Sequence, residues 1–232
     1  MSQNIKIDTE VLEKAVRLSC ILDKLKTLER SGWIVWKVDS ERLESDYEHV
    51  ADALMFAALI YPLYPYKDQV NIDRVNKMLI KHEMGEAVIG DVPVTDKERH
   101  DNKADAEHRA WLLLLGDLPY AKEDYDLLME FDEHKTPDSR FAFFVDKIVA
   151  IKNMKRYYDE GKFHDLQWHI RNCEKVRENT MIQKMAANGA ETAADVWFDE
   201  EWAPYRDDEF FMAIHRILRE MDTDIEPPEL PD

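Results

Sequence analysis

Three places in the sequence put ionisable side chains into apolar surroundings, where they could carry chemistry. His49 lies within a segment rich in alanine, leucine and methionine. His82 is followed directly by Glu83, and Asp146 interrupts the apolar run Phe141–Ala150. Burying such a group is costly unless it is paired or binds a metal ion. Taken singly, each histidine is typical of a core residue whose ring nitrogens are hydrogen-bonded, and Asp146 is typical of a buried ion pair. A function therefore has to be argued from the four residues together.

Helical periodicity indicates how these side chains are positioned. Segment 44–63 is apolar over most of its circumference, which predicts a central, buried helix. Residues 71–84 carry an apolar stripe that includes His82, and a proline opens a helix over 137–158. Apolar residues occupy the turns on both sides of Asp146, so its side chain is expected to face the core. We expect further helices at 8–29, 96–115, 120–134, 165–187, 192–202 and 207–221, and an extended loop at 34–43.

The composition favours an all-α fold. The 232 residues include only six glycines and nine prolines, whereas an all-β chain normally needs many turn residues. Hydrophobic residues make up 45% of the chain, which is ample for a packed core. We expect an α-helical core domain over residues 1–162 and a helical C-terminal extension over 163–232, which ends in a loose, proline-rich acidic tail.

Charge and cysteine usage exclude several classes of protein. The formal net charge of -18 argues against a general basic patch, and so against long nucleic acids as partners. No apolar run approaches the ~20 residues that a membrane helix needs, so we expect no membrane association. Residues 1–10 are polar and carry no apolar signal segment. Cys20 and Cys173 are far apart and form no CxxC pattern, which is typical of reduced thiols, so we expect a cytoplasmic protein.

The order of the ionisable groups along the chain resembles the HD-domain superfamily of metal-dependent phosphohydrolases. In that family a histidine, a histidine followed by an acidic residue, and a distant aspartate lie on separate helices of an all-α bundle. Wider motifs look like the 5'-deoxynucleotidase branch, and the resemblance covers roughly residues 25–161. The segments that carry it are Arg30–Trp33, Glu44–His49, Met78–Asp91 and Asp96–Arg99.

The resemblance implies one bound divalent metal ion. Its ligands in this sequence would be His49, His82, Glu83 and Asp146. Two imidazoles and two carboxylates suit a six-coordinate ion such as Mn²⁺, Co²⁺, Fe²⁺ or Ni²⁺, with Mg²⁺ as a further candidate. Such an ion would neutralise phosphate charge and lower the pKa of a bound water.

The sequence departs from the family pattern at one ligand. Where the family has His-Asp, this chain has His82-Glu83. Glutamate is one methylene longer, so its carboxylate would reach the metal through a different rotamer, bind it bidentately, or not bind it. Because the surrounding motif is otherwise intact, we expect a retained but altered metal site.

Four further residues match family positions with roles in catalysis or substrate binding. Glu86 corresponds to the residue beside the attacking water, and Asp91 to a carboxylate near the leaving group or the water. Paired carboxylates can divide general-base and general-acid work. Arg30 falls at a phosphate-contacting position, and arginine can bind phosphate bidentately. Trp33 falls where the sugar is contacted and could crowd out a 2'-hydroxyl.

Each of these four assignments has a structural alternative. Glu86 could be a solvated helix end, and Asp91 a turn or cap residue. A tryptophan after a glycine turn, such as Trp33, can equally be a core anchor. His108 and His134 are candidates for a second metal site, although the charged sequence around each indicates an exposed face.

The resemblance implies a small nucleotide as substrate and a homodimer as the assembly. The implied activity is release of inorganic phosphate from deoxynucleoside 5'-monophosphates. A dNTP triphosphohydrolase, a two-iron oxygenase and a catalytically degenerate HD-domain regulatory or binding protein remain as alternatives, and Glu83 is the best support for the last. The aromatic residues of the extension would either pack onto the main domain or form the dimer contact.

Overall fold

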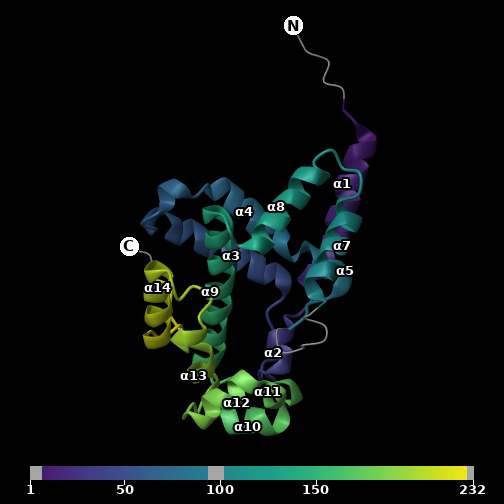
Figure 1. Ribbon diagram of the computed structural model, residues 1–232. Coiled ribbons are helices and arrows are strands. Elements are labelled where there is room, and N and C mark those ends of the chain that lie inside the picture. The colour runs from purple at the N-terminus through teal and green to yellow at the C-terminus, as the bar shows by residue number, and fades with distance from the viewer. Residues whose placement is uncertain (1–6, 94–101, 229–232) are drawn as a thin grey trace.

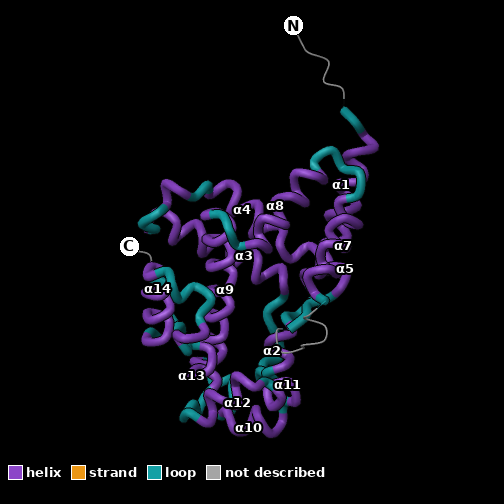
Figure 2. The backbone as a smooth tube through the Cα atoms, in the orientation of Figure 1, coloured by secondary structure: helices purple, strands orange, loops and turns teal. Residues whose placement is uncertain are grey.

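The computed structural model describes residues 7–93 and 102–228, and in these residues the protein is all-α, as expected (Figure 1). Figure 2 shows helices joined by loops, and the described backbone has isolated bridges, Glu29–Ser45 and Asp165–Thr192, in place of strands. None of the described helices is both long and apolar enough to cross a membrane.

The helices follow one another closely along the chain. The α-helices are α1 (Thr9–Leu22), α2 (Ser31–Val35), α3 (Asp46–Ile60), α4 (Ile72–Lys81), α5 (Glu86–Ile89), α7 (Lys103–Leu115), α8 (Ala121–Glu133), α9 (Pro137–Asp159), α10 (Leu166–Asn172), α11 (Glu174–Glu178), α12 (Thr180–Ala187), α13 (Ala193–Trp197) and α14 (Glu209–Glu220). The 3₁₀ turns are η1 (Asp23–Lys26), η2 (Tyr61–Leu63), η3 (Lys67–Gln69), η4 (His82–Gly85) and η5 (Glu200–Trp202).

Helix α9 is the axis of the molecule. Figure 1 shows it at the centre, with α3 and α4 against it and α14 alongside, and these three helices all pack on it. Its start is fixed locally, because Thr136 and Ser139 exchange hydrogen bonds in a capping box and Pro137 fills the first position. The helix begins where the sequence predicts and places Asp146 in the interior, 4% exposed.

Helix α3 is less buried than its composition suggests. Ser45 and Glu48 form its capping box, and it buries His49, Ala53 and Ala57 against its neighbours α4 and α9. Its opposite face is exposed, with Met55 at 67% and Leu59 at 70%. The prediction of a central helix is therefore correct in its packing on α4 and α9, but the burial covers one face of α3 and leaves an apolar stripe exposed on the other.

The predicted helix over 71–84 is interrupted at the acidic motif. Helix α4 ends at Lys81, and η4 and α5 continue the chain as two short turns that end at Gly90, whose φ is +76°. Gly85 allows η4 to approach α7, since a Cβ atom there would lie 3.0 Å from Nε1 of Trp111. A tertiary contact that periodicity does not report thus decides the local geometry.

Other boundaries also differ from the sequence expectations, and the single helix expected over 165–187 is divided into α10, α11 and α12. The segment expected as a loop over 34–43 begins inside α2, which ends at Val35. The first helix stops at Leu22 and is followed by η1. Of the helix expected over 96–115, the described part is α7 from Lys103 on, while residues 96–101, with part of the motif Asp96–Arg99, lie outside the described residues.

The C-terminal extension packs onto the main body through its aromatic side chains. Phe211 is fully buried and meets the rings of Phe141 and Phe144 on α9, at centroid distances of 5.5 and 5.3 Å. One apolar cluster runs from Trp33 through α3, α4 and α9 into the extension as far as Leu218. A second, smaller cluster lies under α1, α7 and α8. The extension therefore shares the main core.

Candidate metal centre

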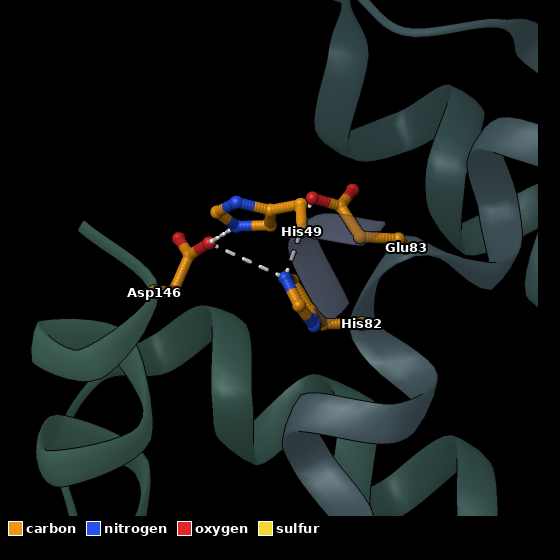
Figure 3. A group of neighbouring side chains, drawn as sticks. All are labelled: His49, His82, Glu83 and Asp146. Atoms are coloured by element: carbon orange, nitrogen blue, oxygen red, sulfur yellow. Dashed lines mark hydrogen bonds and ion pairs between the residues drawn. The ribbon is translucent and has the colours of Figure 1, made fainter. Parts of the chain in front are cut away.

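Four side chains from three segments converge in the interior (Figure 3). They are His49 of α3, His82 and Glu83 of η4, and Asp146 of α9, and each offers one ligand atom within 4.8 Å of the others. Nε2 of His49 lies 2.6 Å from Oδ1 of Asp146, and Nε2 of His82 lies 3.4 Å from that same oxygen. All four are buried, with exposures of 0% to 7%. The structure thus brings together the four residues that the sequence singled out as ligands.

The contacts of the two histidines direct the Nε2 atom of each ring toward the centre of the cluster, where Nε2 of His49 meets Asp146. Nδ1 of His82 donates to the carbonyl of Leu79 at 2.9 Å, so in the neutral ring, the form that binds a metal, Nε2 carries the lone pair. Nε2 of His82 is buried and has no hydrogen-bond partner. On the other ring, Nδ1 of His49 faces Oε1 of Glu44 at 3.5 Å, which directs Nε2 inward. An orphaned imidazole nitrogen beside two carboxylates fits a divalent metal ion.

Without a metal, protons take the place of the cation. Burial lowers the pKa of His82, but the nearby charges of Glu83 and Asp146 outweigh it and raise the pKa to about 10. Burial raises the pKa of Asp146, and the ammonium of Lys147 together with both histidines brings it well below its usual range. Oδ2 of Asp146 pairs with Nζ of Lys147 at 2.8 Å, so Asp146 is also in a buried ion pair.

Glu83 faces Arg30 as well as the cluster. Nη1 of Arg30 donates to Oε1 of Glu83 at 2.8 Å, and the same oxygen lies 3.3 Å from Nε2 of His82. Nη1 of Arg30 also lies 3.8 Å from Oδ1 of Asp46. The guanidinium of Arg30 is mostly buried and lies close enough to the cluster to contact an anion bound there. A metal ion bound by Oε1 of Glu83 would have to share this oxygen with Arg30.

A second group of carboxylates lies beside the first. Its members are Asp46, Glu86 and Asp91, whose oxygens approach one another within 4.8 Å. Asp91 accepts a hydrogen bond from the backbone N–H of Ser31 at 2.5 Å. Both oxygens of Asp46 and Oε2 of Glu86 are buried without a hydrogen-bond partner. The predicted pair, Glu86 and Asp91, is therefore joined by a third acid, and the group is able to bind a cation or to hold protons.

Burial and mutual repulsion favour protonated carboxyls in this second group. Burial, followed by the charge of Glu83, raises the pKa of Asp46 to about 7. The same two causes raise the pKa of Glu86 well above its usual range, against the opposing charge of Lys103. In the metal-free protein these carboxyls therefore hold protons, whereas a cation bound beside them would favour the ionised form, in which a carboxylate can act as a general base.

Trp33 lies in the core rather than on a cavity wall. It is 2% exposed, and its ring stacks on Trp197 at 5.5 Å. Its Nε1 donates to Oε2 of Glu44 at 2.9 Å, and the other oxygen of Glu44 is the one that faces His49. These contacts fit the alternative left open by the sequence, a core anchor, and they make Trp33 part of the support of the first histidine.

Three residues near the cluster were missed in the sequence. Glu44 and Asp46 stand just before His49, and acidic residues next to a candidate ligand are a signal that could have found them. Lys103 pairs with Glu86 at 2.8 Å from another helix, and nothing in its local sequence marks it. His108 and His134 belong to neither group: His108 pairs with Asp132 at 2.8 Å, and His134 stacks on Phe143 at 3.7 Å.

Comparison with known proteins gives one family. The family model described as "HD domain" matches residues 22–188 of the chain, a stretch that crosses the domain boundary predicted at 162. A 5'-deoxynucleotidase of Dictyostelium discoideum is 30% identical over 155 residues, which cover 65% of this chain and 80% of that protein. A 5'-deoxynucleotidase of Homo sapiens is 27% identical over 184 residues, 76% of this chain and 85% of that protein. A conserved hypothetical protein from Pyrococcus furiosus shares the fold with a TM-score of 0.61 at 20% identity, over 89% of this chain and 99% of that one.

Proposed function

Because the chain belongs to the HD-domain family, we propose that it is a metal-dependent phosphohydrolase that releases phosphate from deoxynucleoside 5'-monophosphates. The observation that carries the proposal is the convergence of His49, His82, Glu83 and Asp146, with a bare Nε2 on His82. The substrate class comes from the names of the relatives, which are 5'-deoxynucleotidases.

In this proposal the metal supplies Lewis acidity at the phosphate and an acidified water. His49, His82, Glu83 and Asp146 would hold it as one Mn²⁺, Co²⁺, Fe²⁺, Ni²⁺ or Mg²⁺ ion, and the two imidazole donors favour the transition metals. Glu44 keeps His49 oriented, and the carbonyl of Leu79 keeps His82 oriented.

The remaining polar groups act on the substrate and on protons. The guanidinium of Arg30 binds the phosphate, since it stands beside the cluster and is already largely desolvated. Glu86 accepts the proton of the attacking water, and its buried, unpartnered Oε2 is the oxygen available for this. Asp91, held by the N–H of Ser31, assists at the leaving oxygen.

The assembly and the cellular compartment are part of the same proposal. We propose a homodimer, supported by the exposed apolar stripe of Met55, Leu59 and Leu63, which a second copy could cover. Two unpaired cysteines suit a reducing compartment, and we propose the cytoplasm. Molecular mass in solution, measured by light scattering, tests the dimer: a monomer at micromolar concentration would rule it out.

The activity is tested with a panel of dNMPs, NMPs and dNTPs, supplemented with Mn²⁺ or Co²⁺ and resolved by mass spectrometry. Nucleoside plus orthophosphate from dNMPs is the expected result. Nucleoside plus triphosphate from a dNTP would instead move the chain to the triphosphohydrolases. No turnover together with no bound metal would leave the degenerate regulatory protein, for which the Arg30–Glu83 ion pair would then be the explanation.

A further inference from the structure

Lys103 reaches the second carboxylate group from a different helix. It is the first residue of α7, and its Nζ lies 2.8 Å from Oε1 of Glu86 and 3.3 Å from Oε1 of Glu107. Its side chain is 24% exposed, so the ammonium is partly removed from water. Helix α7 packs directly on η4 and α5, and Gly85 allows that close approach. The position of Lys103 relative to Glu86 is therefore fixed by helix packing.

The two oxygens of Glu86 have different surroundings. Oε1 accepts a hydrogen bond from Lys103, whereas Oε2 is buried and has no partner. Glu86 itself is 1% exposed. A carboxylate anchored through one oxygen leaves the other in a defined direction, and rotation about its last torsion is restricted by the anchor.

The acidic residues around Glu86 repel its ionised carboxylate. Asp46, Glu83 and Asp91 all raise its pKa by their charges, and Lys103 is the group that acts in the opposite sense. A carboxylate among like charges gains from a fixed cation at hydrogen-bond distance. Lys103 thus supplies both the anchor and the compensating charge.

We propose that Lys103 is a positioning residue for Glu86: it holds Oε1 so that Oε2 is presented to the attacking water. This inference rests on the proposed phosphohydrolase function. In that hydrolysis the water oxygen forms the new bond to phosphorus and passes one proton to Oε2. The ester oxygen leaves with the electrons of the broken P–O bond and takes up the proton that Oε2 received, so that Glu86 returns to its starting state. Lys103 acts through Glu86, because its ammonium is directed to the carboxylates of Glu86 and Glu107.

The test compares Lys103→Gln and Lys103→Arg with a matched control, Lys81→Gln. Lys81 is 23% exposed and pairs with the buried Asp124, so it resembles Lys103 in burial and charge but lies outside both carboxylate groups. Steady-state kinetics on a dNMP, bound metal and thermal unfolding are measured for each purified protein. We expect Lys103→Gln to lower kcat by about 10- to 100-fold with KM within about threefold. Lys103→Arg should recover most of kcat, and Lys81→Gln should match the wild type in kcat and KM, even where the loss of its ion pair with Asp124 lowers Tm.

A double-mutant cycle with Glu86→Gln separates positioning from general structural damage. If Lys103 acts through Glu86, Lys103→Gln should cost almost nothing further in the Glu86→Gln background. An equal loss in both backgrounds, or a raised KM with unchanged kcat, overturns the role of Lys103 while the phosphohydrolase function stands. A wild type that turns over no deoxynucleotide, with its metal bound, overturns both.

Discussion

At the scale of single residues, Glu83 is the position where this chain departs from the pattern it resembles. Its Oε1 accepts a hydrogen bond from Arg30 and also lies 3.3 Å from Nε2 of His82. Whether Glu83 binds metal is therefore a question of competition between a guanidinium and a divalent cation.

Replacing Glu83 measures how much its carboxylate contributes to metal binding. We expect Glu83→Gln to weaken Mn²⁺ or Co²⁺ binding by at least about tenfold, because the amide keeps the shape and removes the charge. Asp124→Asn is the matched control, since Asp124 is a buried carboxylate, 5% exposed, outside the cluster. Isothermal titration with each metal gives the affinities. Equal metal affinity for Glu83→Gln and the wild type would show that Glu83 pairs with Arg30 and does not bind the metal.

Asp46 predicts a dependence of stability on pH. Its pKa is raised to about 7, so the folded state binds the proton more tightly than the unfolded state does. The tighter proton binding stabilises the folded state; this contribution to the free energy of unfolding is complete below about pH 4 and is lost as the pH rises through 7. In metal-free protein, Asp46→Asn should therefore gain Tm over the wild type as the pH goes from 4 to 8, by roughly 2–4 °C for each kcal/mol relieved. A Tm difference that stays constant over this range contradicts the assignment.

At the scale of elements, the packing of η4 on α7 decides the shape of the motif. Gly85 lies where a Cβ atom would be 3.0 Å from Nε1 of Trp111, a contact closer than ordinary packing allows. The same contact sets the distance between Glu86 and Lys103, because these residues follow Gly85 and open α7. The interior is too closely packed to absorb the added methyl without movement.

Gly85→Ala tests this element contact. We expect a loss of about 1–3 kcal/mol in the free energy of unfolding from overpacking, with a loss of kcat as Glu86 shifts relative to Lys103. Gly32→Ala is the control, since a Cβ atom there would meet nothing within 4 Å. Denaturant unfolding and dNMP turnover give the two readouts. An unaffected Gly85→Ala variant would mean that η4 can move away from α7 at little cost.

At the scale of the whole molecule, the core continues from the family domain into the extension. Residues beyond 188 supply several of the most buried side chains, among them Phe198, Tyr205 and Phe211. Trp197 stacks on Trp33, which in turn bonds Glu44 beside His49. The extension therefore contributes to the support of the candidate metal centre.

Truncation distinguishes a shared core from an independent appendage. A chain ending at residue 188 should fail to fold, because truncating even one large buried aromatic typically costs about 3–5 kcal/mol out of a total stability of about 5–15 kcal/mol. Removing only residues 225–232 is the control, since the described part of this tail is exposed and irregular. Circular dichroism and thermal unfolding report the result. A cooperative fold for 1–188 would restore the idea of a separate extension.

The sequence by itself determined the all-α class, the main helices and the residue types of the metal cluster. Helix starts such as Thr136 and Ser45 depend on hydrogen bonds to residues three positions away, and apolar periodicity reports which face is buried. Asp146 was identified as an inward-facing acid for this reason alone, while the grouping of the four ligands came from a resemblance in their order along the chain.

Only the tertiary structure decided which partners these residues have. The pairing of Arg30 with Glu83, the burial of Trp33 against Trp197, and the reach of Lys103 to Glu86 all join segments far apart in the chain. Such contacts depend on how helices pack against one another, and that packing is set by the summed fit of many side chains. The spacing of residues along the chain does not specify this packing. The chemistry of each residue could therefore be named from the sequence, whereas the distances between the residues could not.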